Sequence, residues 1–103
     1  MATDLEASRL MVRHGARMIT AGEPNYTMYC AMAKSFATDK CWNVVNDCLQ
    51  MHGGYGYLQD YPIERFLRDL RVHQILEGTN EIMAHIIQRT LLKDEWVWKK
   101  SSY

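Results

Sequence analysis

One carboxylate in this sequence stands where a general base could work. Glu77 follows the apolar pair Ile75 and Leu76 and precedes Gly78, just before an amphipathic segment that opens at Asn80. A carboxylate held between an apolar wall and a rigid turn is a common arrangement for a general base, because partial desolvation raises its affinity for a proton. The alternative that these residues leave open is an ordinary loop glutamate ahead of a helix.

The residues after Glu77 predict the start of a helix. Thr79 is a good N-cap, and Asn80 and Glu81 suit a first turn, where backbone N–H groups are free and the helix dipole favours acceptors. Gly78 permits a backbone shape, or an approach of a ligand to the main chain, that a Cβ would block. The sequence therefore predicts that Glu77 lies at the mouth of a helix.

A second stretch could also meet a ligand. The longest predicted helix ends with Gln50, Met51, His52, Gly53 and Gly54, and aromatic rings alternate with glycine just beyond. Bare backbone with nearby side-chain donors could contact a flat ligand or a phosphate. The glycines lack the spacing of a dinucleotide fingerprint, and they end a helix instead of opening one. A glycine-rich C-cap and turn is the other interpretation, and both stay open.

Histidine and cysteine do not predict a metal site. His52, His73 and His85 are scattered, and no His or Cys pair has the spacing of metal ligands. All three cysteines fall on one predicted helix. Cys41 and Cys48 are two helical turns apart, about 10 Å by helix rise, which is too far for a disulfide within that helix. We therefore expect reduced, packed thiols in an intracellular compartment.

The composition limits the class of protein. The 103 residues form one domain at most, and 12 Lys and Arg balance 12 Asp and Glu. Such a chain has no net charge to recruit nucleic acid or an anionic membrane surface. No apolar run is long enough to cross a bilayer, and the N-terminus has neither the apolar core of a signal peptide nor another targeting signal.

Four segments with helical periodicity predict the architecture. They are residues 4–21, about 26–52, about 62–70 and about 79–93, with an irregular connection at 72–78. The expected fold is an all-α antiparallel bundle of three main helices plus a short one.

Each predicted helix has an apolar face, and core packing is the expected role of that face. The faces comprise Leu5, Val12, Ala16 and Ile19 on the first helix; Tyr26, Cys30, Ala33, Ala37, Cys41, Val44 and Cys48 on the second; Ile63, Phe66, Leu67 and Leu70 on the third; and Ile82, Met83, Ile86, Ile87, Thr90 and Leu91 on the last.

The first predicted helix has two further features. Arg9, Arg13 and Arg17 form a basic stripe, which fits either a solvated face or an acidic or phosphate-bearing partner. Gly22 suits the C′ position, and Pro24 cannot continue the helix, so the helix should stop there.

Three motifs in this order and at this spacing resemble the C-terminal helical domain of the acyl-CoA dehydrogenases. They are Gln50-Met51-His52-Gly53-Gly54-Tyr55-Gly56-Tyr57, then Arg68-Asp69, then Ile75-Leu76-Glu77-Gly78-Thr79-Asn80-Glu81-Ile82-Met83. The resemblance covers residues 1–94, which it identifies as part of that domain, and leaves 95–103 as a tail that carries Trp96 and Trp98.

The resemblance implies an FAD-dependent enzyme that oxidises a short branched-chain acyl-CoA thioester to its 2,3-enoyl-CoA. It also implies a homo-oligomer, an electron-transfer flavoprotein as acceptor, and a location in the mitochondrial matrix, or in the cytoplasm of a bacterium. Glu77 would be the base that removes the α-proton. Residues 50–54 and 79–81 would contact FAD, the former on a flavin bound largely by a neighbouring subunit, while Gly78 and Arg89 would lie on the substrate side.

The length of the chain separates the function of the family from that of this chain. Two further domains of the family, and the first helix of the C-terminal one, have no counterpart in these 103 residues. We therefore expect the isolated chain to be inactive. A catalytically silent helical module that associates with itself is the second possibility.

Overall fold

The computed structural model describes residues 1–93 and shows four α-helices. These are α1 (Ala2–Thr20), α2 (Tyr26–His52), α3 (Ile63–His73) and α4 (Asn80–Lys93), and a short 3₁₀ helix, η1 (Gly53–Tyr57), follows α2. No strand occurs between residues 1 and 93. The predicted all-α antiparallel bundle of three main helices and a short one is confirmed. The predicted tail at 95–103, with its tryptophans, lies outside the described residues.

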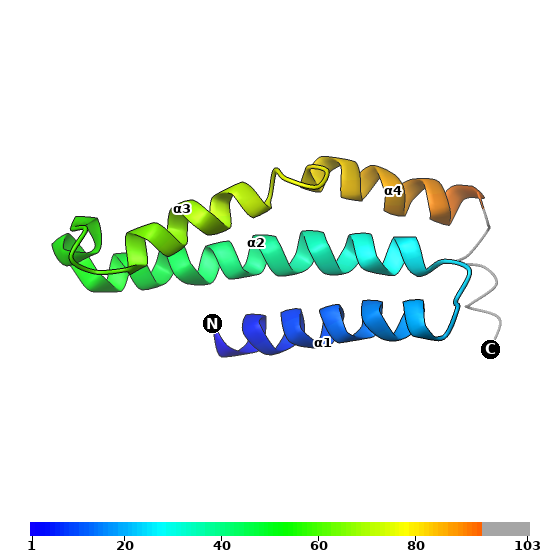
Figure 1. Ribbon diagram of the computed structural model, residues 1–103, viewed down its shortest axis with the longest axis horizontal. Helices are drawn as coiled ribbons and strands as arrows, with labels where there is room; N and C mark the ends of the chain where they lie inside the picture. The colour runs from blue at the N-terminus through cyan, green and yellow to red at the C-terminus, as the bar shows by residue number, and fades with distance from the viewer. Residues whose placement is uncertain (94–103) are drawn as a thin grey trace.

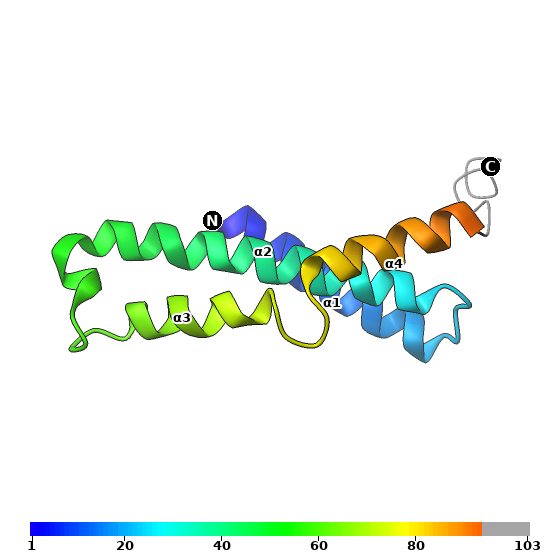
Figure 2. The ribbon, with the colours of Figure 1, turned by 90° about the horizontal axis from the view of Figure 1, so that it is seen from above.

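Helix α2 is the centre of the fold. Helix α1 runs antiparallel along one side of it, and α3 and α4 follow one another along another side (Figure 1). Among the described residues, α1, α3 and α4 each pack against α2 and not against one another, and α3 also contacts η1. Seen from above, α3 runs along the part of α2 that leads into η1, and α4 crosses the other part of α2 (Figure 2). The result is an elongated body of 53 × 24 × 22 Å.

The end of α1 follows the prediction made from Gly22. Its φ of 69° is left-handed, and its N–H donates to the Ile19 carbonyl at 3.1 Å. The N–H of Glu23 donates to the Met18 carbonyl at 3.0 Å, which completes a Schellman motif. Glycine is suited to this position because no Cβ opposes the left-handed conformation.

The predicted boundary between α3 and the connection to α4 was wrong. Helix α3 continues to His73, so the connection to α4 begins at Gln74 and not at residue 72. No glycine or proline interrupts residues 63–77, so nothing local stops the helix earlier.

Instead of a simple turn, η1 folds back on α2, and a Cβ at Gly56 would lie 2.7 Å from the Leu49 carbonyl oxygen. That close approach requires glycine.

The core is small and lies along both sides of α2. Between α1 and α2, small residues let the backbones approach: a Cβ at Gly15 would meet the Ala33 Cβ at 3.6 Å. Most of the buried apolar side chains belong to α2, and α3 and α4 each contribute one. They are Met28, Ala31, Ala33, Val44, Ile63 and Met83.

The predicted packing face of α1 was wrong. Leu5, Val12 and Ile19 are 43%, 50% and 55% exposed, whereas Ser8 and Gly15 are buried. Small residues face α2 because the interface between the two helices is close-packed, so the larger apolar side chains are displaced to the side. Together with the exposed Ala16, these three residues form what we call the α1 apolar stripe. No described element covers it.

Three other predicted core residues are exposed: Tyr26 at 45%, Phe66 at 44% and Ile82 at 50%. Conversely, Met28 is fully buried although it lies outside the stripe predicted for α2. The reason is that α2 has neighbours on more than one side, so a single stripe does not describe its buried surface. Ala33 and Val44 are buried as predicted.

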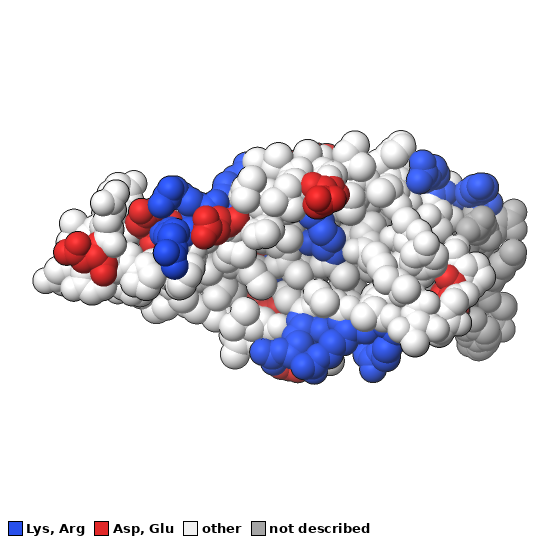
Figure 3. Space-filling model, in the orientation of Figure 1, with Lys and Arg blue, Asp and Glu red and all other residues white. Residues whose placement is uncertain are grey.

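The basic stripe of α1 is exposed. Arg9, Arg13 and Arg17 lie on the surface, and basic side chains gather over this helix (Figure 3). Arg9 pairs with Glu6 at 2.7 Å in an exposed i, i+3 ion pair, which contributes little to stability. Within residues 1–93, no helix combines the length and apolar character needed to span a membrane.

Candidate functional site

The turn between α3 and α4 has an unusual backbone. Glu77 has a φ of 56° and Gly78 a φ of 87°, so two successive residues are left-handed. Within residues 1–93, Glu77 is the sole non-glycine residue with a positive φ. This conformation costs about 1–3 kcal/mol for a residue with a side chain, so the surrounding structure must hold it.

A lysine on α2 holds this turn. The Lys34 Nζ donates to the Gly78 carbonyl oxygen at 2.9 Å and to the Asn80 Oδ1 at 2.6 Å. These two acceptors flank Thr79 at the beginning of α4. One ammonium group therefore joins α2 to the connection that carries Glu77.

An aspartate on the same helix accepts hydrogen bonds from the other side of this turn. Asp39 Oδ1 accepts from the Asn80 Nδ2 at 2.7 Å and from the Gln74 Nε2 at 2.8 Å. The Asn80 Nδ2 also donates to the Thr38 Oγ1 at 2.9 Å, and the Asn80 N–H donates to the Gln74 carbonyl at 3.1 Å. Residues at both ends of the turn are thus tied to α2.

The start of α4 forms as predicted. The Thr79 Oγ1 accepts from the Ile82 N–H at 3.3 Å, as an N-cap side chain does. Gly78 is needed for the shape of the turn, because its φ is positive and a Cβ there would lie 2.8 Å from the Met83 Cε.

The Glu77 side chain is open to solvent. The two apolar residues before it, Ile75 and Leu76, are 52% and 37% exposed, so they form no closed wall in this chain. Within residues 1–93, no hydrogen bond or ion pair reaches the Glu77 carboxylate. The enclosure expected from the sequence is therefore absent from the described residues, although the rigid turn is present.

The second predicted stretch lies at the other end of α3. Gly53 and Gly54 expose bare backbone, since a Cβ on either would meet nothing within 4 Å. Met51 is 69% exposed. The His52 Nδ1 lies 2.7 Å from the Cys48 carbonyl oxygen, so Nδ1 carries the hydrogen and Nε2 is the free nitrogen.

These two places are separated within the chain. The 11 residues of α3, about 16 Å long by helix rise, lie between residues 50–54 and the Glu77 turn. Figure 2 shows the two connections at opposite ends of α3. On α3 itself, a hydrogen bond to Glu64 (2.8 Å) and the charge of Glu64 raise the pKa of the exposed Arg68 guanidinium.

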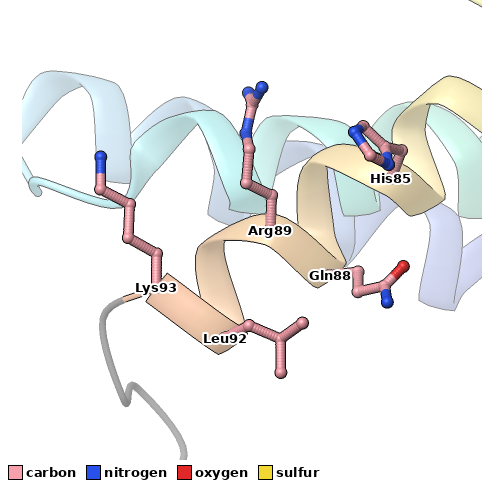
Figure 4. Close-up of a pocket in the computed structure, with 5 residues that line it drawn as sticks. All are labelled: His85, Gln88, Arg89, Leu92 and Lys93. Atoms are coloured by element: carbon pink, nitrogen blue, oxygen red, sulfur yellow. The ribbon is translucent and has the colours of Figure 1, made fainter.

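Arg89 lies toward the far end of α4. It lines an open pocket of about 410 Å³ together with His85, Gln88, Leu92 and Lys93 (Figure 4). It lies nine positions after Asn80, about 13 Å by helix rise, so this chain does not bring Arg89 next to Glu77. The structure thus unites Glu77 with residues 78–81, and leaves Arg89 and residues 50–54 apart.

The contacts of Lys34, Thr38 and Asp39 with this turn were not predicted from the sequence. The signal was weak: a lysine and a threonine at i, i+4 share one face of a long helix, but nothing local shows what that face contacts. Within residues 1–93, no group of three or more His, Cys, Asp and Glu side chains could hold a metal ion. The cysteines are free and half-buried on α2.

Comparison with known proteins gives a consistent result. A family model described as the C-terminal domain of acyl-CoA dehydrogenase matches residues 1–92. Over 95 residues the chain is 58% identical to the mitochondrial isobutyryl-CoA dehydrogenase of Dictyostelium discoideum, covering 92% of this chain and 23% of that protein.

Solved structures share the fold. Butyryl-CoA dehydrogenase from Megasphaera elsdenii is 38% identical with a TM-score of 0.85, covering 89% of this chain and 24% of that one. A chain in a structure described as the electron transferring flavoprotein of Acidaminococcus fermentans is 47% identical with a TM-score of 0.85, again covering 89% and 24%. This chain therefore spans about a quarter of the length of the relatives it matches.

Proposed function

The chain belongs to the acyl-CoA dehydrogenases, a family of oxidoreductases, as part of their C-terminal domain, and we propose that it carries the catalytic base of such an enzyme. The substrate would be a short branched-chain acyl-CoA, and the product the 2,3-enoyl-CoA. The 58% identity with an isobutyryl-CoA dehydrogenase supports this substrate class. The resemblance expected from the three motifs is confirmed.

Glu77 is the proposed base, and the observation that carries the proposal is its clamped left-handed turn. The α-proton next to a thioester carbonyl is weakly acidic, so a carboxylate oxygen must meet it within hydrogen-bond reach. A fixed backbone on both sides of Glu77 limits where that oxygen can lie. Bound FAD supplies the acceptor for the hydride that leaves the β-carbon.

Two features of the described residues fit FAD. The open backbone at Gly53 and Gly54 leaves room for a flat group, and Gln50, Met51 and His52 precede it in the last turn of α2. The first turn of α4, with Thr79, Asn80 and Glu81, lies at the positive end of the helix dipole, which favours anionic groups. Because α3 separates these places, we propose that they serve two different flavins in a homo-oligomer, each shared with a neighbouring subunit.

Gly78 and Arg89 are proposed for the substrate side. Gly78 adjoins the base, and Arg89 offers an exposed guanidinium beside a pocket at the far end of α4. We propose an electron-transferring flavoprotein as the acceptor of the electrons, supported by the likeness to the Acidaminococcus structure. A mitochondrial location is proposed from the Dictyostelium relative.

A second function is favoured by the exposed surface of the described residues. The α1 apolar stripe is exposed, and so is Glu77. A chain that existed as these residues alone would have an apolar surface to cover and a base without its pocket. For such a chain we propose a catalytically silent helical module that associates with itself.

The test of the proposed base uses a chimera. Residues 1–94 replace the matching segment of the Dictyostelium isobutyryl-CoA dehydrogenase, and Glu77→Gln is made in that background. The variant should retain FAD but lose reduction of the flavin by isobutyryl-CoA under anaerobic conditions, by about a hundred- to ten-thousand-fold in rate. Glu6→Gln, at an exposed position on α1, is the matched control. Normal flavin bleaching in Glu77→Gln would place the base elsewhere.

A further inference from the structure

The start of α4 is bound to α2 by a short chain of charge-assisted hydrogen bonds. The Lys34 ammonium donates to the oxygen of the Asn80 side-chain amide at 2.6 Å, and the nitrogen of the same amide donates to the Asp39 carboxylate at 2.7 Å. The amide is therefore polarised from both ends, by a positive charge at its oxygen and a negative charge at its nitrogen. Such bonds are stronger than those between neutral groups, and each reinforces the next.

The lysine also acts directly on the backbone of the turn. Its second bond, at 2.9 Å, goes to the Gly78 carbonyl, which belongs to the residue immediately after Glu77. Gly78 and Glu77 are the two left-handed residues of the connection. Lys34 therefore fixes the backbone that connects Glu77 to the first residue of α4.

The Asp39 carboxylate holds the other side. It accepts from the side-chain amide of Gln74. The backbone carbonyl of Gln74 accepts from the Asn80 N–H. Gln74 Oε1 in turn accepts from Arg71 at 3.0 Å. The turn is thus attached to α2 before and after Glu77, and no bond in the network goes to the Glu77 carboxylate itself.

We propose that Lys34 is a positioning residue for Glu77, which acts through the Gly78 carbonyl and the Asn80 side chain to hold the left-handed turn. This inference rests on the proposed function of Glu77 as a base. A lysine suits the task because one ammonium on a flexible stem supplies several donors and reaches two acceptors at once. Methionine keeps the length and packing of the stem but donates no hydrogen bond.

The experiment compares three variants of the chimeric holoenzyme described above. Lys34→Met removes the donors, and Lys34→Arg keeps a charged donor in the same place. Lys40→Met is the matched control, because Lys40 lies on the same helix with its Nζ 5.7 Å from the centre of the Phe36 ring and makes no bond to the turn. For each protein, kcat, KM, bound FAD and deuterium exchange of the peptide covering residues 74–80 are measured.

Lys34→Met should lower kcat about ten- to a hundred-fold while KM and bound FAD stay unchanged, since a small displacement of a catalytic group affects the reaction more than binding. Exchange in residues 74–80 should quicken in this variant and remain normal in α2. Lys34→Arg should restore much of the rate, and Lys40→Met should resemble the parent in every measurement.

Several outcomes would overturn the inference. One is that kcat and deuterium exchange are both unchanged in Lys34→Met. Another is that Lys34→Met loses FAD while Lys40→Met does not, which would assign the lysine to retention of the cofactor. Failure of Lys34→Arg to recover any activity would also contradict it. The Glu77→Gln variant separates this inference from the proposed function: an active Glu77→Gln enzyme refutes the base, whereas an inactive one beside a fully active Lys34→Met enzyme refutes only the positioning role.

Discussion

Gly78 lies directly against Met83: a Cβ built at position 78 would be 2.8 Å from the Met83 Cε. Met83 lies about one helical turn into α4, so the contact packs the turn against that helix. It also explains why the residue after the proposed base is glycine on structural grounds alone. The collision involves the end of a flexible side chain, so the left-handed φ of 87° is the stronger constraint.

Gly78→Ala should therefore destabilise the chain by about 1–2 kcal/mol, chiefly through the left-handed backbone. Gly54→Ala is the matched control, because that glycine has no positive φ and a Cβ there meets nothing within 4 Å. Urea unfolding followed by circular dichroism measures both. Equal midpoints for the two variants would contradict the assignment of strain to position 78.

Gly56→Ala should be destabilising for a different reason. Its Cβ would lie 2.7 Å from the Leu49 carbonyl oxygen and 3.1 Å from the Leu49 Cγ. Backbone atoms cannot rotate away as a side chain can, so η1 must move off α2, at a cost of about 1–3 kcal/mol. Thermal unfolding of Gly56→Ala against Gly54→Ala tests this, and matching melting temperatures would count against the close approach.

Gly54→Val in the chimera should lower the amount of bound FAD without lowering helix content. The side chain would cover backbone that is now bare, at a position where the structure itself opposes nothing. Gly53 is a poorer choice for this test, because its φ of 62° would add strain to any side chain. Flavin absorbance and circular dichroism are measured on the same sample. Full flavin content in Gly54→Val would show that residues 50–54 do not contact the cofactor.

Met28→Ala should destabilise the chain by about 2–5 kcal/mol, the range for removing a large buried side chain and leaving a cavity. Met28 is fully buried, whereas Met51 is 69% exposed. Met51→Ala is therefore the control and should change the free energy of unfolding by no more than about 0.5 kcal/mol. Denaturant titrations decide the comparison, and a small effect at Met28 would mean that the packing around this side chain is loose.

The isolated 103-residue chain should associate with itself through the α1 apolar stripe, because exposed apolar patches of this kind find partners. Val12→Glu should weaken the association at unchanged helix content. Leu10→Glu is the control, since Leu10 is 52% exposed but lies outside the stripe. Sedimentation at several concentrations provides the measurement. A parent chain that is monomeric throughout, or equal effects of the two substitutions, would contradict the prediction.

The same chain, with FAD added, should not oxidise an acyl-CoA. Glu77 is exposed, and the described residues enclose no thioester beside it. Catalysis requires that the reacting groups be held in place, and a solvated carboxylate alone does not provide this. An electron-acceptor assay with isobutyryl-CoA tests the prediction. Turnover by the isolated chain that disappears on Glu77→Gln would refute it.

The structure follows the predictions from the sequence where the determinants are local. The C′ glycine at position 22 and the N-cap at Thr79 each depend on residues within one helical turn, and both formed as predicted. The packed faces were harder to predict, because α2 is covered on more than one side and a single apolar stripe cannot represent two interfaces. The network of Lys34 and Asp39 could not be predicted, since the partners of Lys34 lie 44 and 46 residues away.

Because α1, α3 and α4 pack on α2 and not on one another, the described residues amount to two helical hairpins that share one arm. In such an arrangement, α1 could detach from α2 in a local opening without breaking any bond of the Lys34 and Asp39 network. Opening of the other hairpin, in which α3 and α4 separate from α2, would release the Glu77 turn. The pairing of α1 with α2 would stay in place. Amide exchange should then resolve two separate opening units of different free energy, with α2 as the last element to lose protection.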